Sequence, residues 1–350
     1  MLAVSRLGDG LLPLMGAVAS LLAGAVAALA VFVLYKHRAN VLAAERSAER
    51  RMRWDPFVLD VLIGESPDAA SVIRRGEERA FVHFLLGYSR RLSGVDRKVV
   101  LRLAEPHLWS VLGDLIETRP EVRARAIETL SELGFEDHVI EIIRALDDPS
   151  PVVASVAAHA MTRPGHPELG AEVVARLDRF TSWDQGFLAA MLASAGPGVS
   201  SVLRVTLLDS SRSPRVRTVC ADALRLLCDP DAADPAAAVL DKATDQELTA
   251  ACLRLLRQVG RSEHAPAVRR WAREGGFATR AHALSTLGTI GDTSDASLAR
   301  LALFDPSPWV ALHAARALMS LGEDGAVRSL ARMDHPRRDL AFEMLEGQRV

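Results

Sequence analysis

The sequence predicts an all-α protein, an α-solenoid of about seven helical hairpins preceded by one transmembrane helix. Large apolar residues recur every 31 or 32 residues, a glycine follows most of them by four residues, and 25 residues near the N-terminus carry no charge. A period of this length indicates stacked supersecondary units. Aromatic residues make up only 5% of the chain, which favours closely packed helices over a β-sandwich.

The uncharged segment runs from Leu11 to Tyr35, with the sequence LLPLMGAVASLLAGAVAALAVFVLY. At about 1.5 Å per residue, a helix of this length exceeds the roughly 30 Å of a bilayer's hydrocarbon core. We therefore expect residues 11–35 to span the lipid bilayer after a short segment, residues 1–10. A cleaved signal peptide is the alternative, although its apolar region runs only about 7 to 15 residues after a basic start.

The charges that follow this segment predict its orientation. Residues 36–53 carry six Lys or Arg side chains against two Glu, a net +4, whereas Arg6 and Asp9 cancel. By the positive-inside rule, we expect the C-terminal part in the cytoplasm. Arginine far outnumbers lysine and alanine is abundant, which indicates a bacterial genome of high GC content. Together with the one predicted membrane helix, this composition predicts a single-pass protein of the bacterial inner membrane. Residues 36–53 lack Gly and Pro and should continue the helix as a basic juxtamembrane segment or a solvated charged face.

Small side chains recur every four residues within the predicted membrane helix, at Gly16, Ser20, Gly24 and Ala28. Such a stripe lets another membrane helix approach closely. It predicts a transmembrane partner or self-association, although an alanine-rich segment also produces such a stripe by chance.

The repeat aligns on one large apolar anchor per copy, with spacings of 31, 31, 32, 32, 31 and 31 residues. The anchors are Leu130, Met161, Leu192, Leu224, Leu256, Leu287 and Leu318. Mostly small or apolar residues lie four and eight positions before each anchor, and this spacing predicts a buried helix face. Glycine four residues after most anchors suits the left-handed conformation that ends a helix, and Ser-Pro pairs at Ser150, Ser213 and Ser307 suit helix starts.

A second, shorter amphipathic run follows each glycine and ends near an acidic residue, so each copy should form two helices. Acids at these turns could be mistaken for catalytic carboxylates, but they are better explained as caps of the next helix. The repeats fill residues 117–347. Residues 54–116 lie outside the period and should form a helical N-terminal cap.

Three segments carry a family resemblance: Asp305–Gly322 (DPSPWVALHAARALMSLG), Ser213–Leu227 (SPRVRTVCADALRLL) and Arg119–Gly134 (RPEVRARAIETLSELG). They resemble HEAT repeats of the phycobilisome-lyase-like type. This resemblance implies the fold but not a function, since such repeats occur in scaffolds, lyases and DNA-repair proteins. Joined to a membrane anchor, the chain is also similar to HEAT proteins that accompany membrane glycosyltransferases in polysaccharide production, including its AFEML segment at residues 341–345.

The sequence contains few patterns that suggest catalysis or metal binding. Cys220, Cys228 and Cys252 have neither disulfide nor zinc spacing, and a phosphate loop and a nucleophile motif are both missing from the sequence. His282 and His313 occupy equivalent positions of adjacent repeats and are a potential metal pair, but they lack an evident third ligand. The net charge of −2 argues against nucleic acid as partner. We therefore expect no catalytic, cofactor-binding or metal-binding residues, no cofactor and no small-molecule substrate.

The second helices carry arginines at similar places, which predicts a partner-binding surface. They are Arg144, Arg176, Arg204, Arg270, Arg300 and Arg332. Stacked in a superhelix, they would line one surface and receive an acidic partner or phosphates, although pairing with nearby acids is an equally plausible role. The sequence thus predicts a membrane-anchored cytoplasmic scaffold that binds a protein partner, itself a membrane protein or part of a membrane complex. A HEAT-type enzyme, either a lyase or a metal-dependent modifying enzyme, and a periplasmic receptor are the alternatives.

Overall fold

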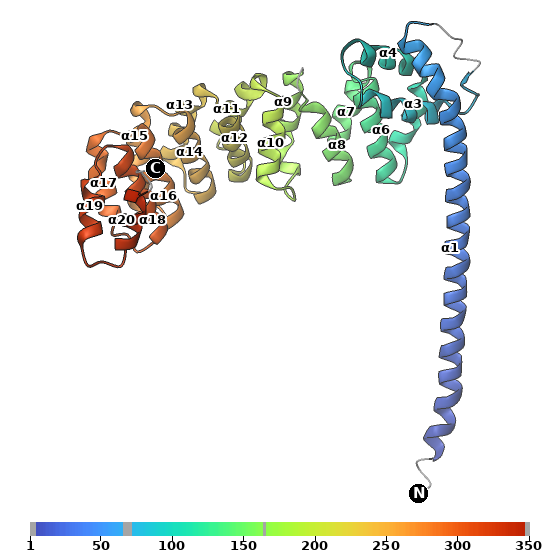
Figure 1. Ribbon diagram of the computed structural model, residues 1–350, viewed down its shortest axis with the longest axis horizontal. Helices are drawn as coiled ribbons and strands as arrows, with labels where there is room; N and C mark the ends of the chain where they lie inside the picture. The colour runs from blue at the N-terminus through green and yellow to red at the C-terminus, as the bar shows by residue number, and fades with distance from the viewer. Residues whose placement is uncertain (1–4, 66–71, 164–165, 347–350) are drawn as a thin grey trace. The chain divides into compact units, whose positions relative to one another are not determined.

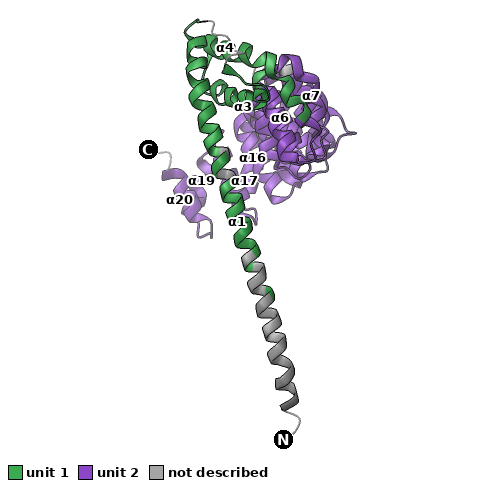
Figure 2. Ribbon diagram, turned by 90° about the vertical axis from the view of Figure 1, so that its right-hand side faces the viewer, with its two compact units in different colours: residues 1–113, 132–134 green, residues 114–131, 135–350 purple. Residues whose placement is uncertain are grey.

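The computed structural model describes the backbone of residues 5–65, 72–163 and 166–346, and only the backbone for residues 5–20, 22–25, 27, 39–40, 43 and 167. All regular secondary structure in these ranges is helical. The chain divides into two compact units, coloured separately in Figure 2. Unit 1 comprises residues 1–113 and 132–134, and unit 2 comprises residues 114–131 and 135–350.

Unit 1 consists of one long helix and a small group of short helices beside its C-terminal end (Figure 1). The helices are α1 (Ser5–Leu62), α3 (Glu78–Ser89), α4 (Gly94–Ala104) and α5 (Trp109–Leu112). An aromatic cluster fastens α3 to α1: the Trp54 ring lies 5.3 Å from that of Phe81 and 5.4 Å from that of Phe84. Arg53 of α1 adds an ion pair to Glu77, at 3.1 Å.

Helix α1 runs through four of the segments predicted from the sequence, which are residues 1–10, 11–35, 36–53 and 54–116. It continues unbroken through residues 35 and 53 and ends at Leu62, just before Gly64, whose φ of 95° marks the turn. The predicted boundary at residue 54 is therefore not a break in the helix. Although Pro56 follows it, the helix continues, and the apolar face at Trp54 and Phe57 packs directly into unit 1.

The predicted membrane segment lies mostly where the structure describes no side chains. Gly16, Ser20 and Gly24 of the small-residue stripe fall outside the described side chains, whereas Ala28 is exposed. Among the described residues, no single helix combines the length and the apolar character that a membrane crossing requires.

Unit 2 is a row of helical hairpins that follow one another in chain order, from α6 to α19 in Figure 1. The first helices of the described hairpins are α6 (Pro120–Leu133), α8 (Pro151–Met161), α10 (Gln185–Ser194), α12 (Pro214–Leu226), α14 (Gln246–Val259), α16 (Phe277–Ile290) and α18 (Pro308–Ser320). The second helices are α7 (Val139–Ala145), α9 (Pro167–Ala175), α11 (Ser200–Leu208), α13 (Ala233–Lys242), α15 (Ala265–Glu274), α17 (Ala296–Ala302) and α19 (Gly325–Arg332). A last helix, α20 (Arg338–Glu346), packs on α18 and α19.

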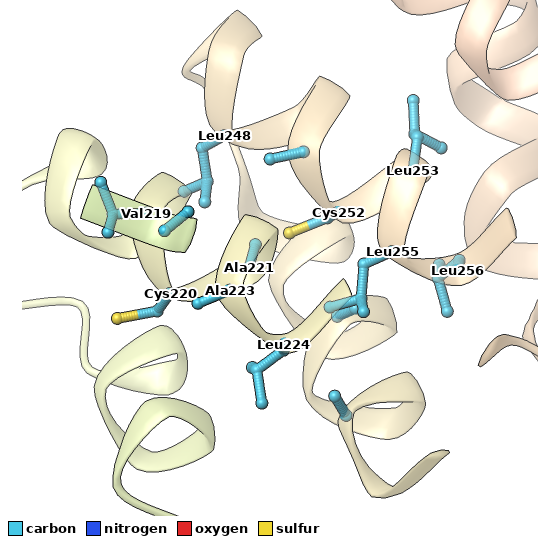
Figure 3. Packing of buried hydrophobic residues seen from close by; sticks show 14 of the residues in the cluster. Val219, Cys220, Ala221, Ala223, Leu224, Leu248, Cys252, Leu253, Leu255 and Leu256 are labelled. Carbon is cyan, nitrogen blue, oxygen red and sulfur yellow. The ribbon is translucent and has the colours of Figure 1, made fainter. Parts of the chain in front are cut away.

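One continuous apolar core runs through unit 2 and contains six of the seven repeat anchors, whereas the first anchor, Leu130, is buried outside this cluster. Each of the seven anchors is at most 1% exposed, which confirms the predicted register. Figure 3 shows two neighbouring copies, in which Leu224 and Leu256 lie one repeat apart beside Cys220 and Cys252. Full burial of one such leucine stabilises a protein by about 1.5–3 kcal/mol, so the repeat is held by its anchors rather than by local helix propensity.

The glycines after the anchors end their helices in two different ways. Gly196 and Gly322 have φ values of 85° and 75°, and Cys228, which replaces glycine in the fourth copy, has a φ of 51°. Gly260 and Gly291 instead adopt extended backbone with φ of −69° and −76°. The left-handed prediction is wrong for these two. Glycine is needed there for space, because an added Cβ would lie 2.4–2.5 Å from the anchor's carbonyl oxygen.

Helix starts also differ from copy to copy. Only Ser213 of the three predicted serines caps with its own side chain, by accepting a hydrogen bond from the Val216 N–H at 3.4 Å. In the third copy, the Asp184 carboxylate accepts from the Phe187 N–H at 2.9 Å. That cap stands where most other copies carry an apolar residue, and α10 has 10 residues, whereas α14 and α16 have 14 each.

Candidate functional site

Four of the six arginines predicted as a partner surface bind neighbouring repeats. The Arg176 Nε lies 3.0 Å from Asp147, and the Arg204 Nη1 lies 2.7 Å from Asp229. Arg270 donates to the backbone carbonyls of Leu240 and Asp241, at 3.3 and 3.4 Å. Each of these contacts joins adjacent repeats, so these side chains hold the stack together.

The remaining arginines of this row differ from one another. Arg300 pairs with Glu323 of the next repeat. Arg144 and Arg332 are exposed, and within the described part of the chain neither forms an ion pair. The row of second-helix arginines therefore presents two unengaged guanidinium groups, one near each end of unit 2.

The first helices form a groove that the sequence pattern does not predict. Its cavity has a volume of about 580 Å³ and is lined from α10, α12, α14 and α16. The residues that line this first-helix groove are Asp184, Gln185, Arg215, Thr218, Gln246, Glu247, Ala250, Arg254, Ala278, Thr279 and His282.

Curvature of the stack produces this groove. The Gln185 side-chain amide donates to the Glu247 carboxylate at 3.2 Å, and these residues belong to α10 and α14, two repeats apart. Two side chains meet across the helix between them only on the hollow side of a curved row. Thr218 lines the groove, and its buried hydroxyl has no hydrogen-bond partner among the described residues.

A basic strip lies beside the groove on α14 and α18 and comprises Arg254, Arg257 and Arg316. Arg254 bonds Asp222 at 3.0 Å, Arg257 donates to the Ser285 hydroxyl at 3.1 Å, and Arg316 is exposed. Asp222 thus balances only one of the three charges.

The two histidines of the potential metal pair lie against this strip. Burial lowers the pKa of His282, and the charges of Arg254 and Arg257 lower it further. Burial, with added repulsion from Arg316, His282 and Arg257, lowers the pKa of His313 to about 4. Both rings are therefore neutral at pH 7.

His313 is buried against the edge of the Trp309 ring, with centroids 5.0 Å apart, and its Nδ1 has no partner among the described residues. No group of three or more His, Cys, Asp or Glu residues in the described ranges is placed to hold a metal ion. The adjacency of His282 and His313 is as the repeat predicts, and the structure adds the arginines around them.

The sequence does contain a signal for the basic strip. Arg254 and Arg316 each lie two residues before an anchor, and Arg257 lies one residue after an anchor. These positions belong to the polar face of the first helices, opposite the face that packs into the core. The arginine pattern of the second helices does not include these three residues, which lie on first helices.

One comparison with known proteins agrees with the helical architecture. HEAT repeats match residues 110–193, which contain the first two hairpins and α10. Among solved structures, human deoxyhypusine hydroxylase in complex with glycerol is 15% identical, with 70% of this chain and 97% of that chain covered and a TM-score of 0.31. Nothing about function follows from a similarity this distant. No curated protein matches the chain. The HEAT-repeat match and the all-helical structure together support a HEAT-repeat protein with an α-solenoid fold.

Proposed function

We propose that this chain is a membrane-anchored scaffold whose first-helix groove binds an extended, acidic segment of a partner protein. HEAT repeats suggest a protein-interaction scaffold of helices, and stacked repeats commonly use a hollow surface for this purpose. One observation carries the choice of surface: Gln185 reaches Glu247 across an intervening repeat. Four first helices therefore contribute side chains to a single cavity.

The chemistry of the groove suits a polypeptide. Gln185 and Gln246 supply amide donors and acceptors, and the Thr218 hydroxyl is unengaged. Such side-chain groups can bond the main chain of an extended segment, and pockets beside that main chain give specificity. The basic strip adds charge for carboxylates, which arginine binds with directional hydrogen bonds. Catalysis forms no part of this proposal.

The membrane location is the second part of the proposal and rests on the sequence. Residues 11–35 form the anchor, and the net charge of +4 after it directs the C-terminal part to the cytoplasm. The resemblance to HEAT proteins that accompany glycosyltransferases suggests a membrane complex of polysaccharide synthesis as the partner. A reporter fused after Val350 tests the orientation, since a reporter active only outside the cytoplasm would instead favour the periplasmic receptor.

Matched charge reversals test the binding surface. The full chain is purified from native membranes in detergent as wild type, as Arg257→Glu/Arg316→Glu, and as Arg144→Glu/Arg332→Glu. The last pair makes the same charge change on the two unengaged arginines of the second helices. Proteins that co-purify with each chain are identified by mass spectrometry. We expect the partner found with the wild type to be lost from Arg257→Glu/Arg316→Glu and retained by Arg144→Glu/Arg332→Glu. Loss of the partner from Arg144→Glu/Arg332→Glu alone would favour the arginines of the second helices as the binding surface. Equal recovery of the partner with the wild type and both variants would reject both surfaces.

A further inference from the structure

Unit 1 contains a cavity of its own, between the C-terminal half of α1 and α3. Its volume is about 490 Å³, within the roughly 300–1,000 Å³ typical of small-molecule sites. The residues that line it are Ser47, Arg50, Arg51, Trp54 and Asp55 from α1, and Ala80, His83, Phe84, Gly87, Tyr88 and Arg91 from α3 and the turn after it.

The charge of this cavity is unbalanced. Arg50 is paired with Glu77 at 3.3 Å. Arg51 and Arg91 are exposed, and neither forms an ion pair within the described residues. The one lining carboxylate, Asp55, accepts a hydrogen bond from the Tyr88 hydroxyl at 2.6 Å. Burial, and then Asp55, raises the pKa of Tyr88 to about 12, so the tyrosine keeps its proton and continues to donate to Asp55.

The wall of the cavity also holds a donor without an acceptor. Trp54 is 2% exposed, and its indole Nε1–H is buried with no hydrogen-bond partner among the described residues. A buried donor left unsatisfied is unfavourable, and the neighbouring rings of Phe81 and Phe84 offer it no lone pair. Trp54 lines the cavity together with Arg51 and Arg91, so a ligand that carries acceptor oxygens could give this N–H a partner once the groups that cover it shift.

We propose that this cavity binds the phosphate group of a small ligand, with Arg51 and Arg91 bonding the phosphate oxygens and Trp54 donating a further hydrogen bond. Phosphate suits this set because it carries several acceptor oxygens, and guanidinium groups bond them in pairs. The proposal is independent of the partner that binds the solenoid.

Two sources share this chemistry, a soluble phosphate ester and a phospholipid headgroup. If residues 11–35 span the bilayer, the 16 residues from Tyr35 to Arg51 place the cavity about 24 Å farther along the helix. A headgroup at the membrane surface would not reach that far beside an upright helix. We therefore expect a soluble phosphate ester, and the experiment separates the two sources.

Gly87 provides a way to fill the cavity without damaging the fold. It lies inside α3 and lines the cavity, and a Cβ added there meets no atom within 4 Å. Glycine within a helix is also unfavourable relative to other residues. Gly87→Leu should therefore preserve or raise the thermal stability of unit 1 while placing a side chain where the ligand would lie.

The test uses the full chain in phosphatidylcholine nanodiscs and titrates glycerol 3-phosphate by calorimetry. We expect saturable binding that weakens at least about tenfold in Arg51→Ala/Arg91→Ala and in Gly87→Leu. Trp54→Phe, which keeps a ring and removes the N–H, should weaken binding several-fold. Arg102→Ala removes an exposed arginine of α4 and Trp109→Phe an exposed tryptophan, and both should bind as the wild type does.

A second arm tests the lipid source. Chain purified with phosphatidylglycerol in detergent is analysed by native mass spectrometry for retained lipid. Retention that is lost in Arg51→Ala/Arg91→Ala, without binding of glycerol 3-phosphate, would identify a headgroup as the ligand and still support a phosphate site. Binding of neither probe would overturn the proposal. So would binding that Arg102→Ala weakens as much as the cavity variants do.

Discussion

The guanidinium group of Arg280 donates two hydrogen bonds to the carboxylate of Asp305, from Nε and Nη2, each 2.9 Å long. Asp305 in turn accepts from the Ser307 N–H at 2.9 Å, where α18 begins. Burial raises the pKa of Asp305, but the hydrogen bond from Arg280 outweighs it together with the Ser307 N–H and the nearby charges, so the net pKa is lowered. The same arrangement joins Arg123, Asp148 and Ser150. A first-helix arginine thus fixes the turn that opens the next repeat.

Removal of this arginine should loosen the junction between repeats. We expect Arg280→Ala to lower the melting temperature by about 3–6 °C, because charge-assisted hydrogen bonds are lost and Asp305 stays partly buried. Differential scanning calorimetry measures this. Arg332→Ala removes an exposed arginine of α19 and should change the melting temperature by less than about 1 °C. Equal melting of both variants would show that the bidentate pair contributes nothing.

His313 should make stability depend on pH. Its pKa is about 4 in the folded chain against an ordinary value of 6.5, so the unfolded chain binds the proton more readily between these values. Stability is therefore complete above about pH 6.5 and falls as the pH is lowered toward 4. The pKa of His282 is lowered as well, chiefly by burial, so this histidine acts on stability in the same direction.

Replacing His313 isolates its contribution. Between pH 7 and 5, we expect the melting temperature of His313→Gln to fall by about 2–5 °C less than that of the wild type. His159→Gln changes an exposed histidine of α8 and should follow the wild-type curve. Parallel curves for all three proteins would contradict a neutral, buried His313.

The cysteines should differ sharply in reactivity. Cys228 is exposed, whereas Cys220 and Cys252 are buried and burial raises the pKa of both thiols to about 12. Since the thiolate is the reactive form, Ellman's reagent should titrate one thiol per native chain and all three in denaturant. Cys228→Ser should leave none in the native chain. Rapid labelling of this variant would mean that the core around Leu224 and Leu256 opens readily.

Cys228 also carries backbone strain that glycine would relieve. Its φ of 51° is a left-handed conformation, which costs a residue with a Cβ about 1–2 kcal/mol. Glycine loses more conformational entropy on folding than other residues, and this loss offsets part of the relieved strain. We therefore expect Cys228→Gly to raise the free energy of unfolding by about 0.5–1 kcal/mol. Urea unfolding against Cys228→Ala, which keeps the Cβ, checks this. Glycine no more stable than alanine would contradict the strain.

How far the sequence predicts this molecule depends on the range of the interaction. The repeat register is local to each first helix, so anchors such as Leu224 could be assigned from spacing alone. The backbone at Gly260 and Gly291 could not, because the need for glycine there comes from the preceding carbonyl and not from a positive φ. Pairing of the second-helix arginines with acids can be expected from the sequence, but the acids of neighbouring repeats that they meet cannot, since Arg204 and Asp229 lie 25 residues apart in different repeats. The first-helix groove depends on curvature, which sums small rotations between repeats and leaves no pattern in the sequence.

We propose above that the partner binds in the first-helix groove. A photo-crosslinking amino acid at Ala278, an exposed residue of this groove on α16, tests it most directly in native membranes, with Ser297 on α17 as the matched exposed position of a second helix. We expect the crosslinker at Ala278, and not at Ser297, to yield a crosslinked protein. The crosslinked peptide should be acidic by mass spectrometry, and Arg257→Glu/Arg316→Glu should abolish the product. Crosslinking from Ser297 alone, or a product indifferent to the charge reversal, would contradict it.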